Sequence, residues 1–211
     1  MTCNKNHDID VGEWFDPPEF SVTGIDIVRS DRAEVTRDIA QEVLESILRI
    51  DDREQARREV YDTIKETVEA IKRGEKPNSY IARPKGMGQS PEEYGSTETR
   101  AASTFRGAKY ANQHFDWERM GEGSKPQFLA IERVRGDWPT QYTAETAEDG
   151  DPVDAIAVEH PNKVPEGFVI DYDTMVEKTI EDPLTPLLSP MRWQFSEALS
   201  DTEQSDIAAF M

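Results

Sequence analysis

The chain has 211 residues, of which 24 are basic and 43 acidic, so its formal net charge is −19. No apolar run approaches the ~20 residues that a membrane-spanning helix needs. The N-terminal residues 1–5 also lack the basic-then-apolar pattern of a secretory signal. The composition therefore predicts a soluble cytoplasmic protein that does not bind membranes, and a single cysteine, Cys3, excludes an internal disulfide.

The charge imbalance comes with a shortage of lysine, since there are 9 lysines and 15 arginines. An acidic, lysine-poor surface suits a cytoplasm with molar salt, where the Debye length falls to ~3 Å. We therefore expect halophilic adaptation, although an ordinary acidic protein is the alternative. A negative charge this large argues against DNA binding in dilute salt, but in molar salt only local basic contacts need to act.

The first elements in chain order are a strand and a helix. Residues 1–20 are polar and predict an irregular entry, and the alternating apolar residues at 20–28 predict one strand. Asp31 and Glu34 then have the spacing of a capping box that opens a helix. This helix is expected to bury one apolar face, formed by Val35, Ile39, Val43, Leu44, Ile47 and Leu48.

A second helix follows closely. Asp51 and Glu54 repeat the capping spacing, and Gly74 stands where a C-terminal cap is expected. The apolar positions between them are Ala56, Val60, Ile64, Val68 and Ile71. The short joint between the two helices predicts an antiparallel pair.

The rest of the chain mixes short strands and helices. Prolines and glycines in residues 75–98 predict a loop with a short strand at 80–82. The elements expected after it are a helix at 99–115, strands at 127–134 and 153–159, an acidic loop at 143–152, and a helix at 171–188 that prolines disturb. The fold class predicted is α+β and mainly helical.

No self-sufficient active site is visible in the sequence. The Asp171-Tyr172-Asp173 turn resembles paired metal-binding aspartates, but apolar residues follow it at helical spacing, so an N-cap is the better interpretation. The histidines and Cys3 lack the spacing of a metal site, and no glycine-rich phosphate loop occurs. We therefore predict no catalytic residue, no metal site and no cofactor in this chain.

A basic island lies at residues 76–115, which contain six basic residues and three acidic ones. Such an island favours a polyanion, because each cation can displace a phosphate counterion. The glycines beside Arg83 and Lys85 would let a strand approach the backbone closely. The predicted nucleic-acid contacts are Arg83, Lys85, Arg100, Arg106, Lys109, Tyr110 and Asn112. A solvated basic face, or internal pairing with the many carboxylates, is the alternative.

The last eight residues have the pattern of a motif that binds a sliding clamp. Gln204 is followed by Ile207, Phe210 and Met211 at the spacing of that motif. One helical turn brings Ile207 and Phe210 to the same side, where they can fill an apolar pocket. Met211 replaces the usual second aromatic residue, which should weaken binding, and an amphipathic tail that matches by chance is the alternative.

Four segments carry a further signal in chain order: residues 20–31 (FSVTGIDIVRSD), 80–85 (YIARPK), 104–112 (TFRGAKYAN) and 168–184 (FVIDYDTMVEKTIEDPL). Together they resemble the C-terminal part of family B DNA polymerases, especially those of tailed phages and archaea. The resemblance implies a palm-edge strand at 1–30, a helical thumb with a small β-containing tip at 31–190, and a clamp-binding tail at 191–211. Family thumbs hold primer-template duplex through its phosphates, a role that the resemblance assigns to Arg83, Lys85, Arg106 and Lys109.

The resemblance also implies what is missing. The palm aspartates that hold two divalent ions such as Mg²⁺ are absent, so this chain alone is predicted not to polymerise DNA. Its expected partners are primer-template DNA, a sliding clamp, and an N-terminal fragment with palm, fingers and exonuclease. A split subunit and a piece separated by an intein or frameshift are both open. A non-catalytic adaptor that binds the clamp, and a halophilic enzyme with an unrecognised site, are the alternatives.

Overall fold

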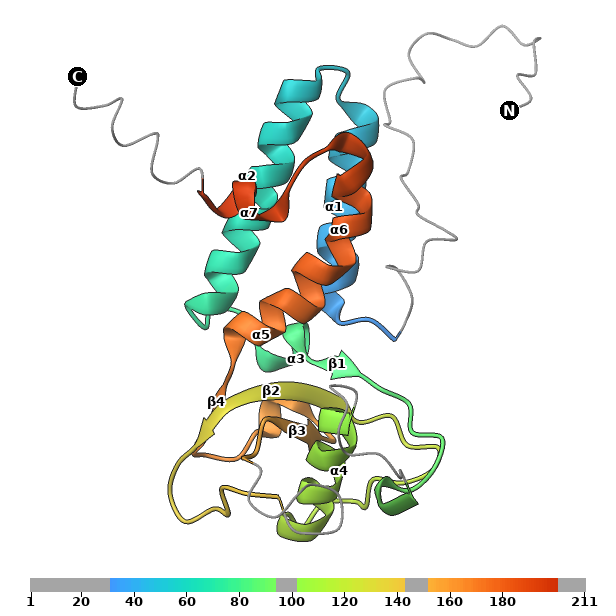
Figure 1. Ribbon diagram of the computed structural model, residues 1–211, viewed down its shortest axis with the longest axis vertical. Coiled ribbons are helices and arrows are strands. Elements are labelled where there is room, and N and C mark those ends of the chain that lie inside the picture. The colour runs from blue at the N-terminus through green and yellow to red at the C-terminus, as the bar shows by residue number, and fades with distance from the viewer. Residues whose placement is uncertain (1–30, 94–101, 143–151, 201–211) are drawn as a thin grey trace, which may run out of the picture.

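The computed structural model describes residues 31–93, 102–142 and 152–200, with side chains of α4 from residue 104. It consists of two regions, one above the other in Figure 1. The helical region contains α1, α2 and α5 to α7, and the tip contains β1 to β4 with α4. The strand predicted at 20–28, Arg100, and the clamp motif at 204–211 lie outside the described residues.

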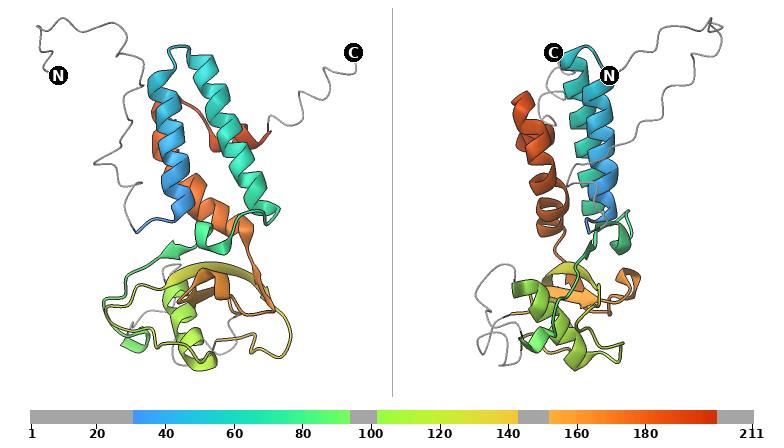
Figure 2. Two further views of the ribbon diagram at one scale, coloured as in Figure 1. Left: turned by 180° about the vertical axis from the view of Figure 1, so that it is seen from behind. Right: turned by 90° about the vertical axis from the view of Figure 1, so that its right-hand side faces the viewer.

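The helical region is built on an antiparallel pair, α1 (Glu34–Arg49) and α2 (Arg53–Lys72), which stand side by side in both views of Figure 2. Every predicted apolar position of α2 is buried. On α1 the predicted face is correct only in its first half. Leu44 and Ile47 are half-buried, and Leu48 is 68% exposed.

Both predicted capping boxes were misplaced. The N-cap of α1 is Ala33, which makes no side-chain cap, so Asp31 does not have the predicted role. Ala33 is instead buried in the core. The N-cap of α2 is Asp52, one residue after the prediction, and its carboxylate accepts a 2.8 Å hydrogen bond from the backbone N–H of Gln55.

The end of α2 was predicted correctly. Gly74 has φ +70°, and its N–H donates to the carbonyl of Ile71, while the N–H of Glu75 donates to that of Ala70. This pair of bonds is a Schellman cap, whose left-handed residue favours glycine. The cap turns the chain out of the hairpin toward the tip.

The short strand predicted at 80–82 is wrong. One helical turn, α3 (Asn78–Ile81), occupies the position, and β1 (Arg83–Pro84) follows it. The turn follows Pro77, which favours the start of a helix, and it closes with the N–H of Ala82 on the carbonyl of Asn78. A short 3-10 turn, η3 (Pro91–Glu93), follows.

The tip is a small antiparallel sheet. Its long strand, β2 (Gln127–Val134), pairs with β1, with β3 (Ala155–Val158) and with β4 (Phe168–Ile170). The predicted strands at 127–134 and 153–159 are confirmed, and the prediction missed β4. A mainly helical α+β fold with a small β-containing tip is therefore confirmed.

Helix α4 (Ala102–His114) packs against β3 and closes one face of the sheet (Figure 1). Gly107 makes this contact possible, since a Cβ there would lie 3.1 Å from the carbonyl oxygen of Ala155 and from the nitrogen of Ala157. A second buried cluster fills the space beneath the helix and contains Met87, Ala108, Ala111, Met120, Phe128 and Ala157.

The chain returns to the helical region through α5 (Tyr172–Val176), a π-helical turn (Glu177–Glu181) and α6 (Asp182–Leu188). The predicted N-cap interpretation is confirmed at Asp171, whose carboxylate accepts from the N–H of Thr174 at 2.9 Å. It also accepts from the Thr174 hydroxyl at 2.6 Å.

Pro183 disturbs this helix as predicted, and α1 compensates for it. Proline has no N–H to donate to the carbonyl of Thr179, four residues earlier. The buried hydroxyl of Thr36 donates to that oxygen at 2.6 Å. This bond fixes the π-helical turn against α1.

After η6 (Ser189–Met191), the last described helix, α7 (Phe195–Ser200), packs on α2. The Tyr61 hydroxyl donates to Glu197 Oε2 at 2.6 Å, and Arg57 pairs with the same oxygen at 3.0 Å. These contacts fasten the C-terminal part of the described chain to the hairpin.

Candidate nucleic-acid interface

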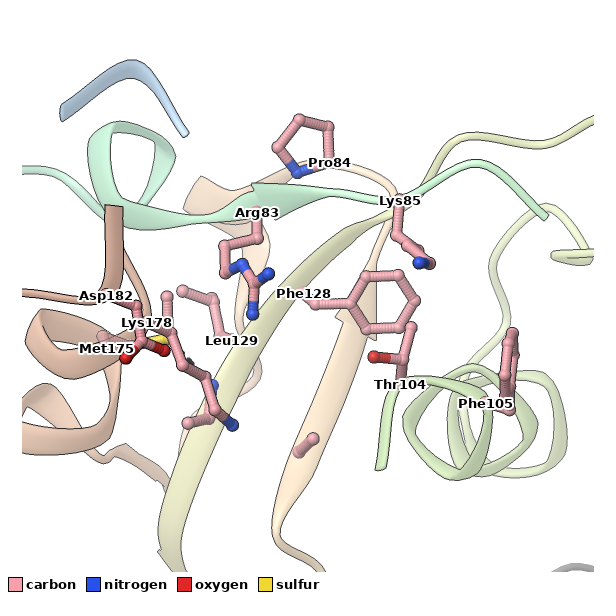
Figure 3. A pocket seen from close by; sticks show the side chains of 12 residues that line it. Arg83, Pro84, Lys85, Thr104, Phe105, Phe128, Leu129, Met175, Lys178 and Asp182 are labelled. Atoms are coloured by element: carbon pink, nitrogen blue, oxygen red, sulfur yellow. Dashed lines mark hydrogen bonds between the residues drawn. The ribbon is translucent and has the colours of Figure 1, made fainter. Parts of the chain in front are cut away.

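A hollow of about 320 Å³ opens where β1, β2, the start of α4 and the π-helical turn meet (Figure 3). Among the described residues, three cations lie on its polar rim: Arg83 of β1, Lys85 directly after β1, and Lys178 of the π-helical turn. Among the described residues that line it, Asp182 is the only carboxylate. The rim is therefore positive within a chain whose net charge is −19.

The floor of the hollow follows from small residues in register. Ala130 of β2 lies opposite Ala155 of β3, so two short side chains meet where larger ones would fill the space. Phe128, Leu129 and Met175 supply the rest of the apolar floor, with Leu129 and Met175 on one side of β2 and Phe128 on the other. Thr104 and Phe105 of α4 border the side opposite Lys178, as Figure 3 shows.

Arg83 is partly desolvated at the rim. Removal of solvent by its neighbours lowers the pKa of its guanidinium, the nearby Arg32 lowers it further, and Asp182 acts in the opposite direction. Partial desolvation strengthens any interaction with an anion, because water competes less for the charge. Lys85 is exposed, and its backbone N–H donates to the carbonyl of Pro126 at 3.0 Å, which holds this segment on the sheet.

The α4 side chains predicted to contact DNA have partners inside the tip. Arg106 pairs with Asp154 at 2.7 Å and stacks over the ring of Tyr142. Lys109 is 3% exposed. The buried Tyr110 donates its hydroxyl to the carbonyl of Pro139 at 2.6 Å.

Asn112 has a similar structural role. Its side-chain amide donates to the carbonyl of Met120 and accepts from the N–H of the same residue, both at 2.8 Å. Internal pairing was the alternative interpretation of the basic island, and these contacts agree with it for α4. DNA contact by Arg106, Lys109, Tyr110 and Asn112 stays a prediction, and Arg83 and Lys85 offer the more accessible surface.

The fold is similar to part of a known polymerase structure. No protein-family model matches the chain, and no curated protein matches it by sequence. Among solved structures, it resembles the family B DNA polymerase from the hyperthermophilic archaeon Pyrobaculum calidifontis, with a TM-score of 0.52 and 18% sequence identity. The match covers 74% of this chain and 17% of that polymerase chain. At this identity the likeness shows the fold alone, which is that of a polymerase fragment.

Sequence reasoning found two of the three rim cations. Arg83 and Lys85 belong to the predicted basic island, whereas Lys178 and Asp182 are more than 90 positions further along the chain. The only available signal for them was the Glu-Lys-Thr segment within the polymerase resemblance. These residues reach the hollow because α5 and the π-helical turn follow β4 directly, and α5 packs beside β2.

Across residues 31–93, 102–142 and 152–200, no three histidine, cysteine or carboxylate side chains gather closely enough to hold a metal ion. In the same ranges, no helix combines the length and apolar character needed to cross a membrane.

Proposed function

We propose that this chain is the C-terminal thumb segment of a replicative family B DNA polymerase and grips primer-template duplex at the rim of the hollow. The observation that carries the proposal is that Arg83, Lys85 and Lys178 line one hollow in a strongly acidic protein, with Asp182 as the only carboxylate among the described residues of the lining. Such a rim suits phosphates, which fix position without reading sequence. The likeness of the fold to an archaeal polymerase fragment supports the proposal.

The proposal includes the division of labour expected of such a segment. A partner fragment would supply palm, fingers and exonuclease, with the two divalent ions of phosphoryl transfer. Residues 1–30 would complete the palm edge, residues 31–190 would form the thumb, and residues 191–211 would carry the clamp-binding tail. The acidic surface would keep the segment soluble in the salt-rich cytoplasm of a halophilic archaeon or its infected cells, where short-range contacts carry the binding.

Fluorescence anisotropy of a labelled primer-template, measured over a salt series, tests the DNA contact. The triple variant Arg83→Ala, Lys85→Ala, Lys178→Ala should weaken binding at every salt concentration. It should also reduce the slope of log K against log salt by about 2 to 3, because each lost phosphate contact removes about 0.9.

Arg58→Ala is the matched control, because it removes an exposed cation from α2, which does not line the hollow. It should leave the slope unchanged. An unchanged slope in the triple variant, or no measurable binding by the parent protein at the lowest salt, would overturn the proposal.

The tail is tested separately by pull-down with the sliding clamp. Phe210→Ala should abolish capture, since an aromatic anchor that fills an apolar pocket dominates such interfaces. A chain that binds the clamp but not primer-template would be the adaptor of the alternative interpretation. Primer extension by a palm-and-fingers fragment, with and without this chain, then decides whether it acts as a thumb.

A further inference from the structure

The hollow has an apolar part that phosphate contacts do not require. Cations on an open surface are sufficient to hold a duplex backbone. Here three cations share the lining with five apolar residues, which are Phe128, Leu129, Ala130, Ala155 and Met175. A floor of this kind would leave a bound phosphodiester backbone above an empty apolar recess, so phosphate binding alone does not explain it.

We propose that the hollow takes a single nucleoside monophosphate unit, with its phosphate at the rim and its sugar or base against the apolar floor. The proposal rests on the proposed function in that the rim must bind phosphate. The volume of the hollow, about 320 Å³, lies at the lower end of the range for small-ligand pockets, which is roughly 300 to 1,000 Å³. One nucleotide, and no larger unit, suits that space.

The polar groups are arranged for such a ligand. Arg83 and Lys178 reach into the space from different elements, so a phosphate between them would meet two cations. Thr104 adds a hydroxyl on the α4 side and can donate or accept. Asp182 accepts hydrogen bonds, which suits a sugar hydroxyl or an exocyclic amino group and disfavours further phosphates.

The same chemistry has two sources, a free nucleotide and a nucleotide of a DNA strand. A base inside a duplex is paired and stacked, and its removal from the stack is unfavourable. An unpaired nucleotide at the end of a strand has lost its pairing already. A duplex with one unpaired terminal nucleotide should therefore bind more tightly than its blunt counterpart.

Isothermal titration calorimetry with the unmodified protein tests the pocket directly. Deoxyadenosine monophosphate should bind at least ~10-fold more tightly than inorganic phosphate and than deoxyadenosine, because only the nucleotide uses both rim and floor. If phosphate binds as tightly as the nucleotide, or if the nucleotide does not bind, the inference is wrong.

Two variants separate the floor from the rim. Ala130→Leu places a larger side chain on the floor and should reduce nucleotide affinity ~10-fold while blunt-duplex affinity changes less than ~2-fold. If circular dichroism shows that this variant does not fold, Lys178→Met tests the rim, because its loss should weaken nucleotide binding. Unchanged nucleotide affinity in a folded variant would exclude the assigned position.

The duplex arms distinguish the two sources and the two proposals. Tighter binding of the duplex with an unpaired end supports a strand nucleotide, and equal binding with nucleotide affinity retained supports a free nucleotide. If blunt duplex fails to bind while the nucleotide binds, the proposed duplex grip fails and the pocket stands. If duplex binds and the nucleotide does not, only the pocket inference fails.

Discussion

The helical region and the tip are stabilised by different kinds of packing. The hairpin buries a stripe of branched aliphatic side chains, among them Val43, Val60 and Ile64, which recur at helical spacing. The tip gathers rings around Tyr110, whose neighbours include Phe115 at 5.8 Å, Phe168 at 5.9 Å and Tyr142 at 6.0 Å between ring centroids. An aliphatic stripe depends on local periodicity, whereas the tip depends on partners far apart in sequence and on close fits at single residues.

The largest effect is expected in the hairpin. Ile64 of α2 is fully buried in the core, so Ile64→Ala should lower the free energy of unfolding by about 3 kcal/mol through lost burial and a cavity. Urea denaturation measures it. Leu48→Ala, at a site that is 68% exposed, should change stability by less than about 0.5 kcal/mol, and equal losses at the two positions would contradict the observed helix face.

The second largest loss of stability is expected when a side chain is added where α4 packs closely on β3. Gly107→Val would drive a side chain into the backbone of β3, which cannot move aside like a flexible side chain. We expect a loss of about 2 kcal/mol, measured by urea denaturation. Gly86→Ala is the control, since nothing lies within 4 Å of the added Cβ. A tolerated valine at 107 would mean that α4 does not pack against the sheet as described.

The helices were easier to predict from the sequence than the tip, because helical periodicity is local and the contacts of the tip join residues far apart in the chain. Periodic apolar residues delimited the hairpin almost completely, while β4 is only three residues long and lies directly before a helix. At the candidate site, the charge count identified Arg83 and Lys85. It could not separate them from Arg106, because the partner Asp154 is 48 positions away and pairs with Arg106 only through the packing of α4 on β3.

A smaller effect is expected where the two helical layers meet. Thr36→Val keeps the shape of the side chain but removes the hydroxyl that donates to the carbonyl of Thr179. Because that buried acceptor also lacks a partner at Pro183, we expect a loss of about 1.5 kcal/mol. Thr67→Val, on a partly exposed part of α2, should change stability by less than about 0.5 kcal/mol. Equal stability losses in the two variants would show that the hydrogen bond from Thr36 to Thr179 does not contribute to stability.

The smallest effect concerns the attachment of α7. The Tyr61 hydroxyl, followed by the Arg57 charge, lowers the pKa of Glu197 below its ordinary value of 4.5. A depressed carboxylate pKa contributes stability above the unfolded-state value, and the contribution is lost as the pH falls through the folded-state value. Thermal melts should show Glu197→Gln less stable near neutral pH, with the difference shrinking below about pH 4.5. A pH-independent difference would contradict the ionic role.

The hydrogen bond from the Thr36 hydroxyl to the carbonyl of Thr179 has a consequence beyond stability, because Lys178 directly precedes Thr179. If the segment from α5 to α6 shifted by one residue along the hairpin, that hydrogen bond would break. Lys178 and Asp182 would then move away from Arg83 together. Thr36 does not line the hollow, yet through Thr179 it holds the turn that carries Lys178. Substitutions in the hairpin that break this hydrogen bond should accordingly change the shape of the hollow.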